Sequence, residues 1–350
     1  MYRWGLGFYQ FFSSIIHTSR HSYEIVFLSM IIPYFFLSSI VFFWLYKKQN
    51  IGIVLSLMGF IIFSFNSNIL NLWFEGFYGN VFSLFIFCLF ILIFSYEKEI
   101  FEKKDKKILF LYTLIFISML LSYSEGVFFV LGPLFLFLII YDLLVKKEFN
   151  FLAYKNIVVS GIIAIILILP AGFFVEWVIT AIKQIFQEGG NGYMQPKWAL
   201  PHEIFGISDI YKTINLTNGG VYIPRENFDI IFSSIITIII LYLYRNYLKN
   251  NLKKVNSLLV VPHILVFFIF VYVYMKSHNN NYMYMKYYIF MLPYLFLLFW
   301  TSVTNFELAN KNKYKICLIL LFLTLHSGFS YIYKYTEQAR FVKSNKIEFY

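Results

Sequence analysis

Two glutamates in short polar stretches between apolar segments are the first candidates for acid–base chemistry. Glu75 lies in Trp73-Phe-Glu-Gly-Phe-Tyr-Gly79, among aromatic side chains and glycines. Glu125 lies in Leu121-Ser-Tyr-Ser-Glu-Gly126, which we expect to form a turn between two helices. A carboxylate among aromatic rings can act as a general base or orient a sugar hydroxyl group. The alternative for both is a solvated turn acid whose glycine closes the loop.

Two cations are candidates for binding a phosphate group. Lys286 stands among tyrosines where a late apolar segment begins, in Tyr282-Met-Tyr-Met-Lys-Tyr-Tyr. Arg225 stands near the end of the longest polar stretch of the chain. A cation at the depth of lipid headgroups can hold a lipid-linked phosphate. Such side chains also commonly just extend from an apolar segment to the headgroups, and this alternative stays open.

Further aromatic and polar residues are candidate contacts for a sugar or an acceptor: Trp73, Tyr78, Tyr193, Trp198 and His202. His202 and Glu203 stand next to each other, but a metal site would need at least one more ligand at a known spacing. The sequence also has no phosphate-binding glycine motif, no dinucleotide fingerprint and no HExxH motif. We therefore predict no metal ion and no cofactor.

The composition indicates that apolar helices position these residues. The chain has 350 residues, of which 60% are hydrophobic and 13% charged, and its mean hydropathy is +0.68. Soluble domains have about 45–50% apolar and about 25% charged residues. This excludes a soluble enzyme, a disordered chain and a disulfide scaffold. We predict an all-α, polytopic transmembrane helical bundle, with Cys88 and Cys317 as buried apolar side chains.

Ten segments are apolar enough to be candidate spans, since a spanning helix needs about 20 mostly apolar residues. They are Ile25–Tyr46, Ile51–Phe65, Val81–Tyr96, Ile108–Leu121, Val127–Val145, Ile157–Val175, Phe228–Tyr244, Leu258–Met275, Tyr287–Val303 and Ile316–Tyr333. The second and fourth are short, so one of them could be a broken or tilted helix. His263 is an ionisable residue within a predicted span, and its simplest interpretation is a hydrogen-bonded core histidine.

The charges of the loops predict the orientation. Loops on one side hold 17 of the 29 Lys and Arg residues, and the other side holds 12 although it includes both tails and the longest loop. Short basic loops face the cytoplasm, so both termini are predicted to be extracytoplasmic. The net charge of +11 is then an orientation signal and not a sign of nucleic-acid binding.

This orientation predicts five parts of the chain. They are an extracytoplasmic segment 1–24, helices 1–6 in 25–175, an extracytoplasmic loop 176–229, helices 7–10 in 230–333 and an extracytoplasmic tail 334–350. The long loop is predicted to begin with an interfacial helix, Glu176–Phe186, anchored by Trp177. Long loops in compact proteins are usually functional or disordered, and the aromatic residues and prolines here favour an ordered loop.

The many helices, short inner loops, acidic outer turns and long outer loop resemble the GT-C superfamily of integral-membrane glycosyltransferases. Three strings carry the resemblance: Trp73–Gly79, Leu121–Gly126 with the following Gly132-Pro133, and Lys286–Pro293. The resemblance implies transfer of a sugar from a polyprenyl-phosphate carrier to a glycan, lipid or protein acceptor on the outer face of the cell membrane. It also implies an acidic base in the first outer loop and basic residues that hold the lipid phosphate.

The first outer segment departs from that pattern, because Glu24 is its only acidic residue. We therefore expect a shortened or inactive member of the group, with Glu24, Glu75 and Glu125 as the candidate bases. Two other classes stay open, a cell-envelope polysaccharide polymerase and a flippase or transporter of a lipid-linked glycan. A transporter predicts ionisable groups near the middle of the membrane.

Overall fold

All elements in the described part of this computed structural model are helices. The structure describes residues 31–74, 78–100, 106–147, 149–169, 200–208, 227–251, 256–276, 281–306 and 310–344. Five helical stretches among them are long and apolar enough to cross a membrane: Ile31–Lys48, Phe151–Ile168, Ile231–Lys249, Tyr287–Thr304 and Asn312–Lys334. A helix covers most of the described part of every predicted span, but the other helices are shorter or less continuously apolar.

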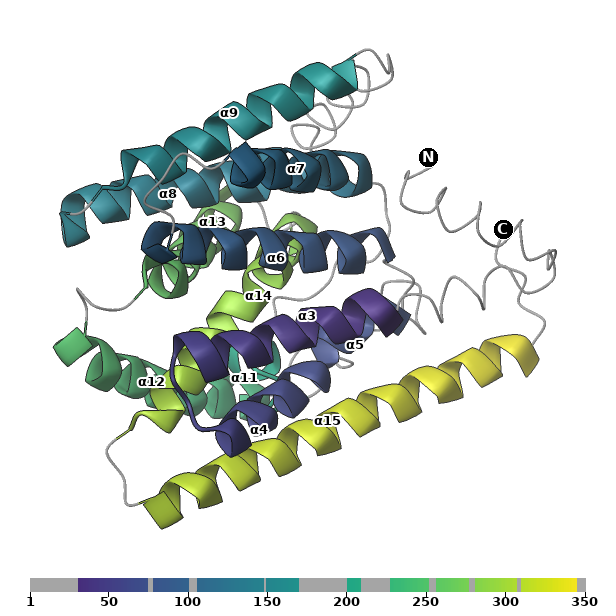
Figure 1. The fold of residues 1–350 in the computed structure, drawn as a ribbon. Coiled ribbons are helices and arrows are strands. Elements are labelled where there is room, and N and C mark those ends of the chain that lie inside the picture. Colours follow the sequence, from purple (N-terminus) through teal and green to yellow (C-terminus); the bar gives the residue numbers. More distant parts are fainter. Residues whose placement is uncertain are drawn as a thin grey trace. The chain divides into compact units, whose positions relative to one another are not determined.

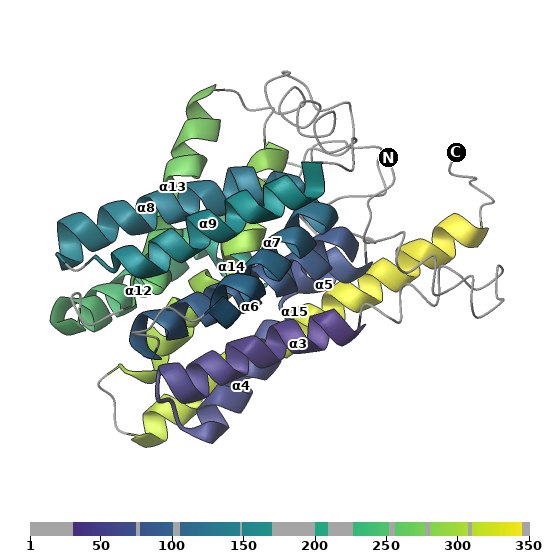
Figure 2. The same ribbon diagram turned by 45° about the horizontal axis from the view of Figure 1, so that its top comes forward.

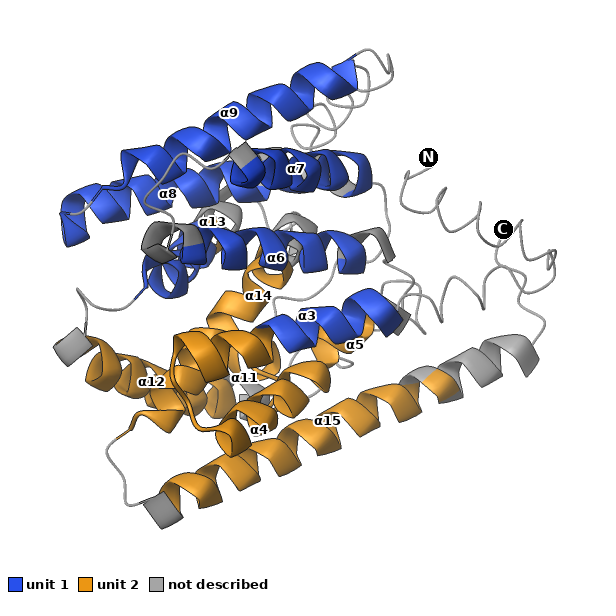
Figure 3. Cartoon of the chain, viewed as in Figure 1, with its two compact units in different colours: residues 1–40, 76–190, 253–268 blue, residues 41–75, 191–252, 269–350 orange. Residues whose placement is uncertain are grey.

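The chain divides into two compact units, coloured separately in Figure 3. Unit 1 consists of residues 1–40, 76–190 and 253–268, and unit 2 of residues 41–75, 191–252 and 269–350. The first described helix, α3 (Ile31–Phe43), contributes to both units, and so does α13 (Ser257–Lys276). Each unit has its own buried core, and the two are described separately below.

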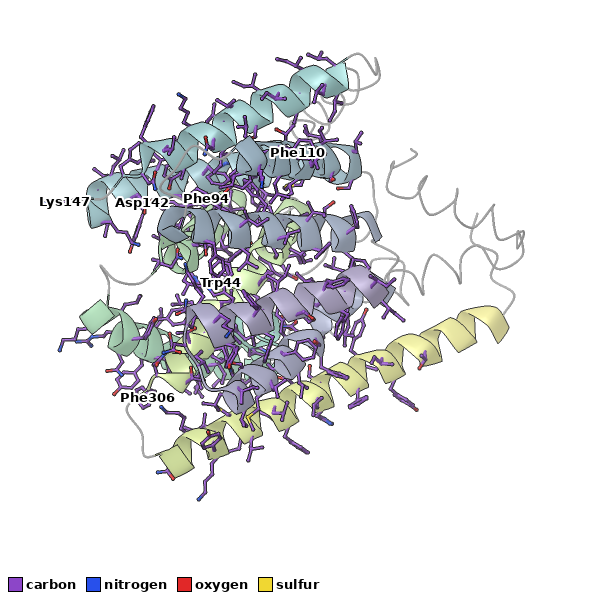
Figure 4. The ribbon with its side chains drawn as sticks, viewed as in Figure 1. Trp44, Phe94, Phe110, Asp142, Lys147 and Phe306 are labelled. Carbon is purple, nitrogen blue, oxygen red and sulfur yellow. The ribbon has the colours of Figure 1, made fainter. Side chains whose placement is uncertain are left out.

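Unit 1 is built mainly from helices that follow one another in the sequence (Figure 1). They are α6 (Tyr78–Ile100), α7 (Lys106–Gly126), η2 (Val127–Leu131), α8 (Gly132–Tyr141), η3 (Asp142–Lys146) and α9 (Phe151–Ile168). Aromatic rings fill its core: Phe94, labelled in Figure 4, lies 5.3 Å from the ring of Phe135 and 5.4 Å from that of Tyr154. These edge-on ring contacts hold α6, α8 and α9 together.

The predicted turn at Leu121–Gly126 is wrong as local structure, because α7 continues through Gly126 and η2 follows directly. The chain nevertheless reverses its direction further on. The ring of Phe90 lies 5.1 Å from Phe116 and 5.6 Å from Phe135, whereas a straight helix would separate those two positions by about 28 Å. The chain thus reverses its direction within helical backbone, and not in the non-helical turn that was predicted.

Unit 1 also contains a buried carboxylate at the start of η3. Asp142 is 1% exposed, and the hydroxyl of Tyr154 on α9 donates a hydrogen bond of 2.7 Å to its Oδ2 atom. Phe149 stacks on the ring of Tyr154, with ring centroids 5.1 Å apart. A buried carboxylate is tolerated only where hydrogen bonds compensate for its lost hydration. The pair therefore ties η3 to the first turn of α9.

Replacing Tyr154 by phenylalanine should lower the thermal stability of the purified protein in detergent by an amount equivalent to about 1–3 kcal/mol, because Asp142 loses a hydrogen bond while it stays buried. The variant Asp142→Asn keeps an oxygen that accepts the same bond and should cost less. Equal stability of Tyr154→Phe and the unchanged protein would show that the hydrogen bond contributes nothing.

Unit 2 contains an interrupted helix. The elements of unit 2 are η1 (Trp44–Lys48), α4 (Ile53–Ser64), α5 (Ser67–Phe74), α11 (Pro201–Ile204), α12 (Asn227–Asn251), α14 (Asn281–Thr304) and α15 (Asn310–Ser344). Helix α4 has 12 residues, too few to cross a membrane, but α5 follows after only Phe65 and Asn66. The two helices thus form one apolar stretch with a break. This agrees with the expectation that the short second predicted span could be a broken helix.

Hydrogen bonds and ring contacts show the directions of the long helices in unit 2. The start of α4 meets the end of α14, where Trp300 Nε1 donates 2.9 Å to the carbonyl oxygen of Leu55, and further along Phe63 packs against Phe296. These two helices are therefore antiparallel. The end of α4 meets the middle of α15, where Phe65 packs against Phe329. The ribbon shows these two helices side by side and running in the same direction (Figure 1, Figure 2).

Several predicted boundaries need correction. The expected loop 66–80 contains helix α5, and α6 already begins at Tyr78. Helix α9 begins at Phe151 inside a predicted loop, and α15 continues to Ser344 inside the predicted tail. In each case charged or amide side chains lower the local hydropathy, but the helix continues through these residues. The predicted interfacial helix Glu176–Phe186 and the segment 1–24 lie outside the described residues.

Of two predictions about single residues, one is confirmed in part and one in full. The Nδ1 atom of His263 lies 3.0 Å from the carbonyl oxygen of Leu259, one helical turn earlier, so His263 is hydrogen-bonded within α13, but its side chain is half-buried and not part of a core. Cys88 and Cys317 are free cysteines, and both are buried.

Candidate functional site

Three buried asparagines mark the break between α4 and α5. Asn66, Asn68 and Asn71 are each no more than 1% exposed, although they lie in an otherwise apolar stretch. Burying an amide side chain is unfavourable unless its donors and acceptors find partners. The hydrogen-bond partners of these three side chains therefore define the candidate site.

Asn66 caps the start of α5. Its carbonyl oxygen accepts hydrogen bonds from the backbone N–H groups of Ile69 and Leu70, and its Oδ1 accepts the N–H of Asn68 at 2.9 Å. An asparagine at this position satisfies N–H groups that have no partner within the helix. Its Nδ2 donates 2.9 Å to the carbonyl oxygen of Ile204, which lies 138 positions later in the sequence.

Asn68 connects three parts of the chain. Its Nδ2 donates to the carbonyl oxygen of Glu203 at 2.7 Å and to Oδ1 of Asn66 at 2.9 Å. Its Oδ1 accepts the hydroxyl of Tyr288 on α14 at 2.9 Å. One turn further, Oδ1 of Asn71 accepts the hydroxyl of Tyr331 on α15 at 2.8 Å.

We call Asn66, Asn68, Asn71, Tyr288 and Tyr331 the asparagine cluster. Its hydrogen bonds link α5 to both α14 and α15, and those of Asn66, Asn68 and Tyr288 are connected to one another. Connected networks of this kind are strong in a low-dielectric interior. The cluster therefore gives the broken helix a defined geometry.

A short segment from the predicted long outer loop packs against this cluster. We call residues 200–208 the docked segment. Two of its residues are ionisable, and both are buried, with His202 2% and Glu203 4% exposed. Glu203 Oε2 accepts the backbone N–H of Leu200 at 2.7 Å, and the ring of His202 lies edge-on to Phe232 of α12 at 5.2 Å.

Gly206 lets the docked segment turn close to the cluster. Its φ of +73° is a conformation that side chains other than glycine rarely adopt. A Cβ atom there would lie 3.2 Å from the amide of Asn66 and 3.3 Å from Cγ2 of Thr324 on α15. Just before this turn, Phe205 stacks on Phe299 of α14, with ring centroids 4.6 Å apart.

The chemistry available at this place is that of amides, phenols, an imidazole and a carboxylate. Amide and phenol groups bind hydroxyl and phosphate oxygens, while an imidazole or carboxylate can move a proton. Polar groups among membrane helices are functional candidates by default. Among the residues that the structure describes, no three His, Cys, Asp or Glu side chains come together in a way that could hold a metal ion.

Of the candidate catalytic, phosphate-binding and sugar-binding residues from the sequence, His202 is the one with a described side chain. Glu125 lies in α7 of unit 1, Lys286 in α14, Trp73 in α5 and Tyr78 in α6, and their side chains are outside the described set. Glu24, Glu75, Tyr193, Trp198 and Arg225 lie outside the described residues altogether. Their assignments as base, phosphate ligands and sugar contacts stay predictions.

The asparagine cluster was missed because residues 66–80, between the second and third predicted spans, were interpreted as a loop. A usable signal exists in Phe65-Asn-Ser-Asn-Ile-Leu-Asn71, where asparagine follows an apolar run and recurs within about one helical turn. An asparagine directly before an apolar helical stretch is typical of a helix start. The partners Tyr288 and Tyr331 have no comparable signal, because tyrosines are common at the ends of membrane helices.

The helices and their buried polar network define an α-helical protein with several candidate membrane spans. Comparison of the chain with protein-family models, with curated proteins and with solved structures finds no match. The functional argument therefore depends on the chain's own residues.

Proposed function

We propose that this protein is a membrane glycosyltransferase that moves a sugar from a polyprenyl-phosphate carrier to a cell-envelope acceptor on the outer face of the cell membrane. In this proposal the ten apolar segments are ten spans, both termini are extracytoplasmic, and the longest polar stretch is an extracytoplasmic loop. The partners are the lipid-linked sugar, a glycan or lipid acceptor, and membrane lipids, without nucleic acid.

The burial of His202 and Glu203 carries the proposal. These two residues come from the predicted outer loop, and the backbone carbonyl oxygen of Glu203 accepts a hydrogen bond from the amide of Asn68, which in turn accepts the hydroxyl of Tyr288. A transferase acting on a lipid-linked sugar needs polar groups where membrane helices meet such a loop, because the sugar is polar while its carrier stays in the bilayer. The docked segment provides this combination.

The other residues have the roles suggested by their types. Glu75, Glu125 and Glu24 are the candidate bases, Lys286 and Arg225 the candidate phosphate ligands, and Trp73, Tyr78, Tyr193, Trp198 and His202 the candidate sugar or acceptor contacts. A base within reach of an acceptor hydroxyl and cations near the departing phosphate are the minimum for such a transfer.

A specific observation favours transport of a lipid-linked glycan as the second candidate. Transporters often bind their substrates where membrane helices are interrupted, and α4 and α5 form an interrupted helix. The third class considered from the sequence, a polysaccharide polymerase, gains no comparable support from the described residues.

A transfer assay tests the proposal. Membranes from cells that express the chain are supplied with a radiolabelled polyprenyl-phosphate hexose or pentose, and label in lipid, glycan and protein fractions is measured. We expect transfer above that of membranes without the chain, and at least about a tenfold decrease for Glu75→Gln, Glu125→Gln or Lys286→Ala, since each removes a candidate charged group.

The matched control is Gly161→Ala, because Gly161 lies in α9 and an added methyl group would meet only the ring edge of Phe116 at 3.9 Å. Transfer should be unchanged in this variant. Movement of the labelled lipid across vesicles without any transfer would refute the enzyme and favour the transporter.

A further inference from the structure

The docked segment reaches deep along a candidate membrane span. Every residue from Tyr287 to Thr304 of α14 is buried, and this stretch is apolar enough to cross a membrane. Phe205 stacks on Phe299, which is 12 residues after Tyr287 and therefore about 18 Å further along the helix. A segment of the predicted outer loop thus lies at the depth of the helices.

Two hydrogen bonds of one kind join this segment to the start of α5. Nδ2 of Asn66 donates to the carbonyl oxygen of Ile204, and Nδ2 of Asn68 donates to that of Glu203. Both donors belong to the fixed side of the contact, since Asn66 caps α5 and Asn68 is held by Tyr288. If the segment moved out, two amide donors would be left facing the place that it had occupied.

Two ionisable residues of the docked segment make its burial unfavourable. His202 and Glu203 are almost completely buried, and ionisable groups at membrane depth are costly. The segment also packs through aromatic rings, but its backbone accepts two amide N–H groups that a ligand oxygen could accept instead, and it carries two buried ionisable groups. These features suit it to reversible release.

We propose that the docked segment, residues 200–208, is a re-entrant lid over the asparagine cluster, and that its release presents Nδ2 of Asn66 and Asn68 to the oxygen-rich head group of a lipid-linked phosphate. The lid follows from the contacts of the segment, while the identity of the ligand rests on the proposed function. In the closed state the carbonyl oxygens of Glu203 and Ile204 occupy the positions of ligand oxygens.

A thiol-labelling experiment tests the lid without requiring any enzymatic activity. In a Cys88→Ala, Cys317→Ala background, Ile204→Cys places a thiol at a side chain that is 7% exposed. The full chain is purified in detergent, and the rate of reaction with a charged maleimide is measured. Loss of one amide donor in Asn66→Ala or Asn68→Ala should raise this rate at least about fivefold, which corresponds to about 1 kcal/mol.

The matched control is Asn71→Ala. Asn71 is equally buried on the same helix, but its amide oxygen is bonded to Tyr331 and not to the docked segment. The labelling rate should then stay within about twofold of the background. Equal rates in all three variants, or unchanged rates in Asn66→Ala and Asn68→Ala, would overturn the lid.

A second measurement separates release of the lid from unfolding. Cys317 on α15 is 0% exposed, so its labelling in a chain that keeps this cysteine reports opening of unit 2 as a whole. Asn68→Ala should leave the labelling of Cys317 unchanged. Labelling of Cys317 that rises in parallel with that of the thiol introduced at position 204 would refute a lid and indicate a purely structural segment.

Polyprenyl monophosphate in the same detergent tests the ligand. It should increase the labelling of the Ile204→Cys thiol in the otherwise unchanged background, because the head group competes with the segment for the two amide donors. Unchanged labelling at saturating lipid would overturn the ligand assignment. A failed transfer assay together with positive labelling results would refute the proposed function and leave the lid intact.

Discussion

Replacing Trp300 by alanine is expected to lower the free energy of unfolding by about 3–5 kcal/mol, the range for removing a large buried aromatic side chain. Trp300 is 0% exposed, stacks on Phe296 with an interplanar angle of 11°, and donates its indole N–H to the carbonyl oxygen of Leu55. A cavity at this position would leave both the ring contacts and that carbonyl oxygen without their partner. We expect poor expression and a strongly lowered midpoint of thermal unfolding in detergent.

The variant Trp300→Phe separates the two contributions. It keeps most of the apolar area and loses the hydrogen bond, so its cost should be about 1–2 kcal/mol. A loss as large as that of Trp300→Ala would assign the whole effect to the hydrogen bond. Near-normal stability of Trp300→Ala would contradict the packing described for α4 and α14.

Replacing Gly328 by alanine is the second large effect that we expect, about 2–3 kcal/mol of lost stability. A Cβ atom at Gly328 would lie 2.6 Å from the carbonyl oxygen of Phe65 and 3.2 Å from its Cβ atom. The first of these is a backbone atom, so the helices must move apart. Small residues at such positions let membrane helices approach closely.

The Gly161→Ala variant is the control for helix propensity in this comparison. Gly161 also lies inside a helix, but an added Cβ atom there would have its nearest neighbour at 3.9 Å. Alanine is a better helix former than glycine by about 1 kcal/mol, so Gly161→Ala should be neutral or stabilising. Parallel thermal unfolding curves measure both variants, and equal behaviour would refute a close approach of α15 to the break.

These two positions also bear on the candidate site. Trp300 fixes the start of α4 against α14, and Gly328 brings α15 up to Phe65 at the end of α4. The asparagine cluster begins at the very next residue. A substitution of Gly328 by serine should therefore disturb the hydrogen bond between Tyr331 and Asn71 before it unfolds the protein.

Hydropathy predicted the positions of the long helices well, because a run of about 20 apolar residues has few other stable structures. It was misleading at residues 67–74. Asparagine lowers hydropathy in the same way whether it faces water in a loop or is buried and hydrogen-bonded in a helix. Only the partners of the side chain distinguish these cases, and the partners of Asn68 and Asn71 are 220 and 260 positions away.

The docked segment shows the same difference. Its residues, with Pro201 before two ionisable side chains, are typical of an exposed loop, and the sequence analysis placed His202 there as a sugar or acceptor contact. In the structure both ionisable residues are buried, because the side-chain amides of Asn66 and Asn68 donate hydrogen bonds to the backbone carbonyl groups of the segment.

The sequence by itself determined that this is an all-helical chain suited to membranes, since composition and apolar run length are local properties that need no knowledge of the fold. Tertiary structure alone decided which polar residues come together. Contacts between segments more than 100 positions apart determine the surroundings of the break at Phe65–Asn66, the cluster around Asn68 and the position of Gly206. Hydrogen bonds over such separations leave no periodic pattern in the sequence, so they appear only when the helices are packed.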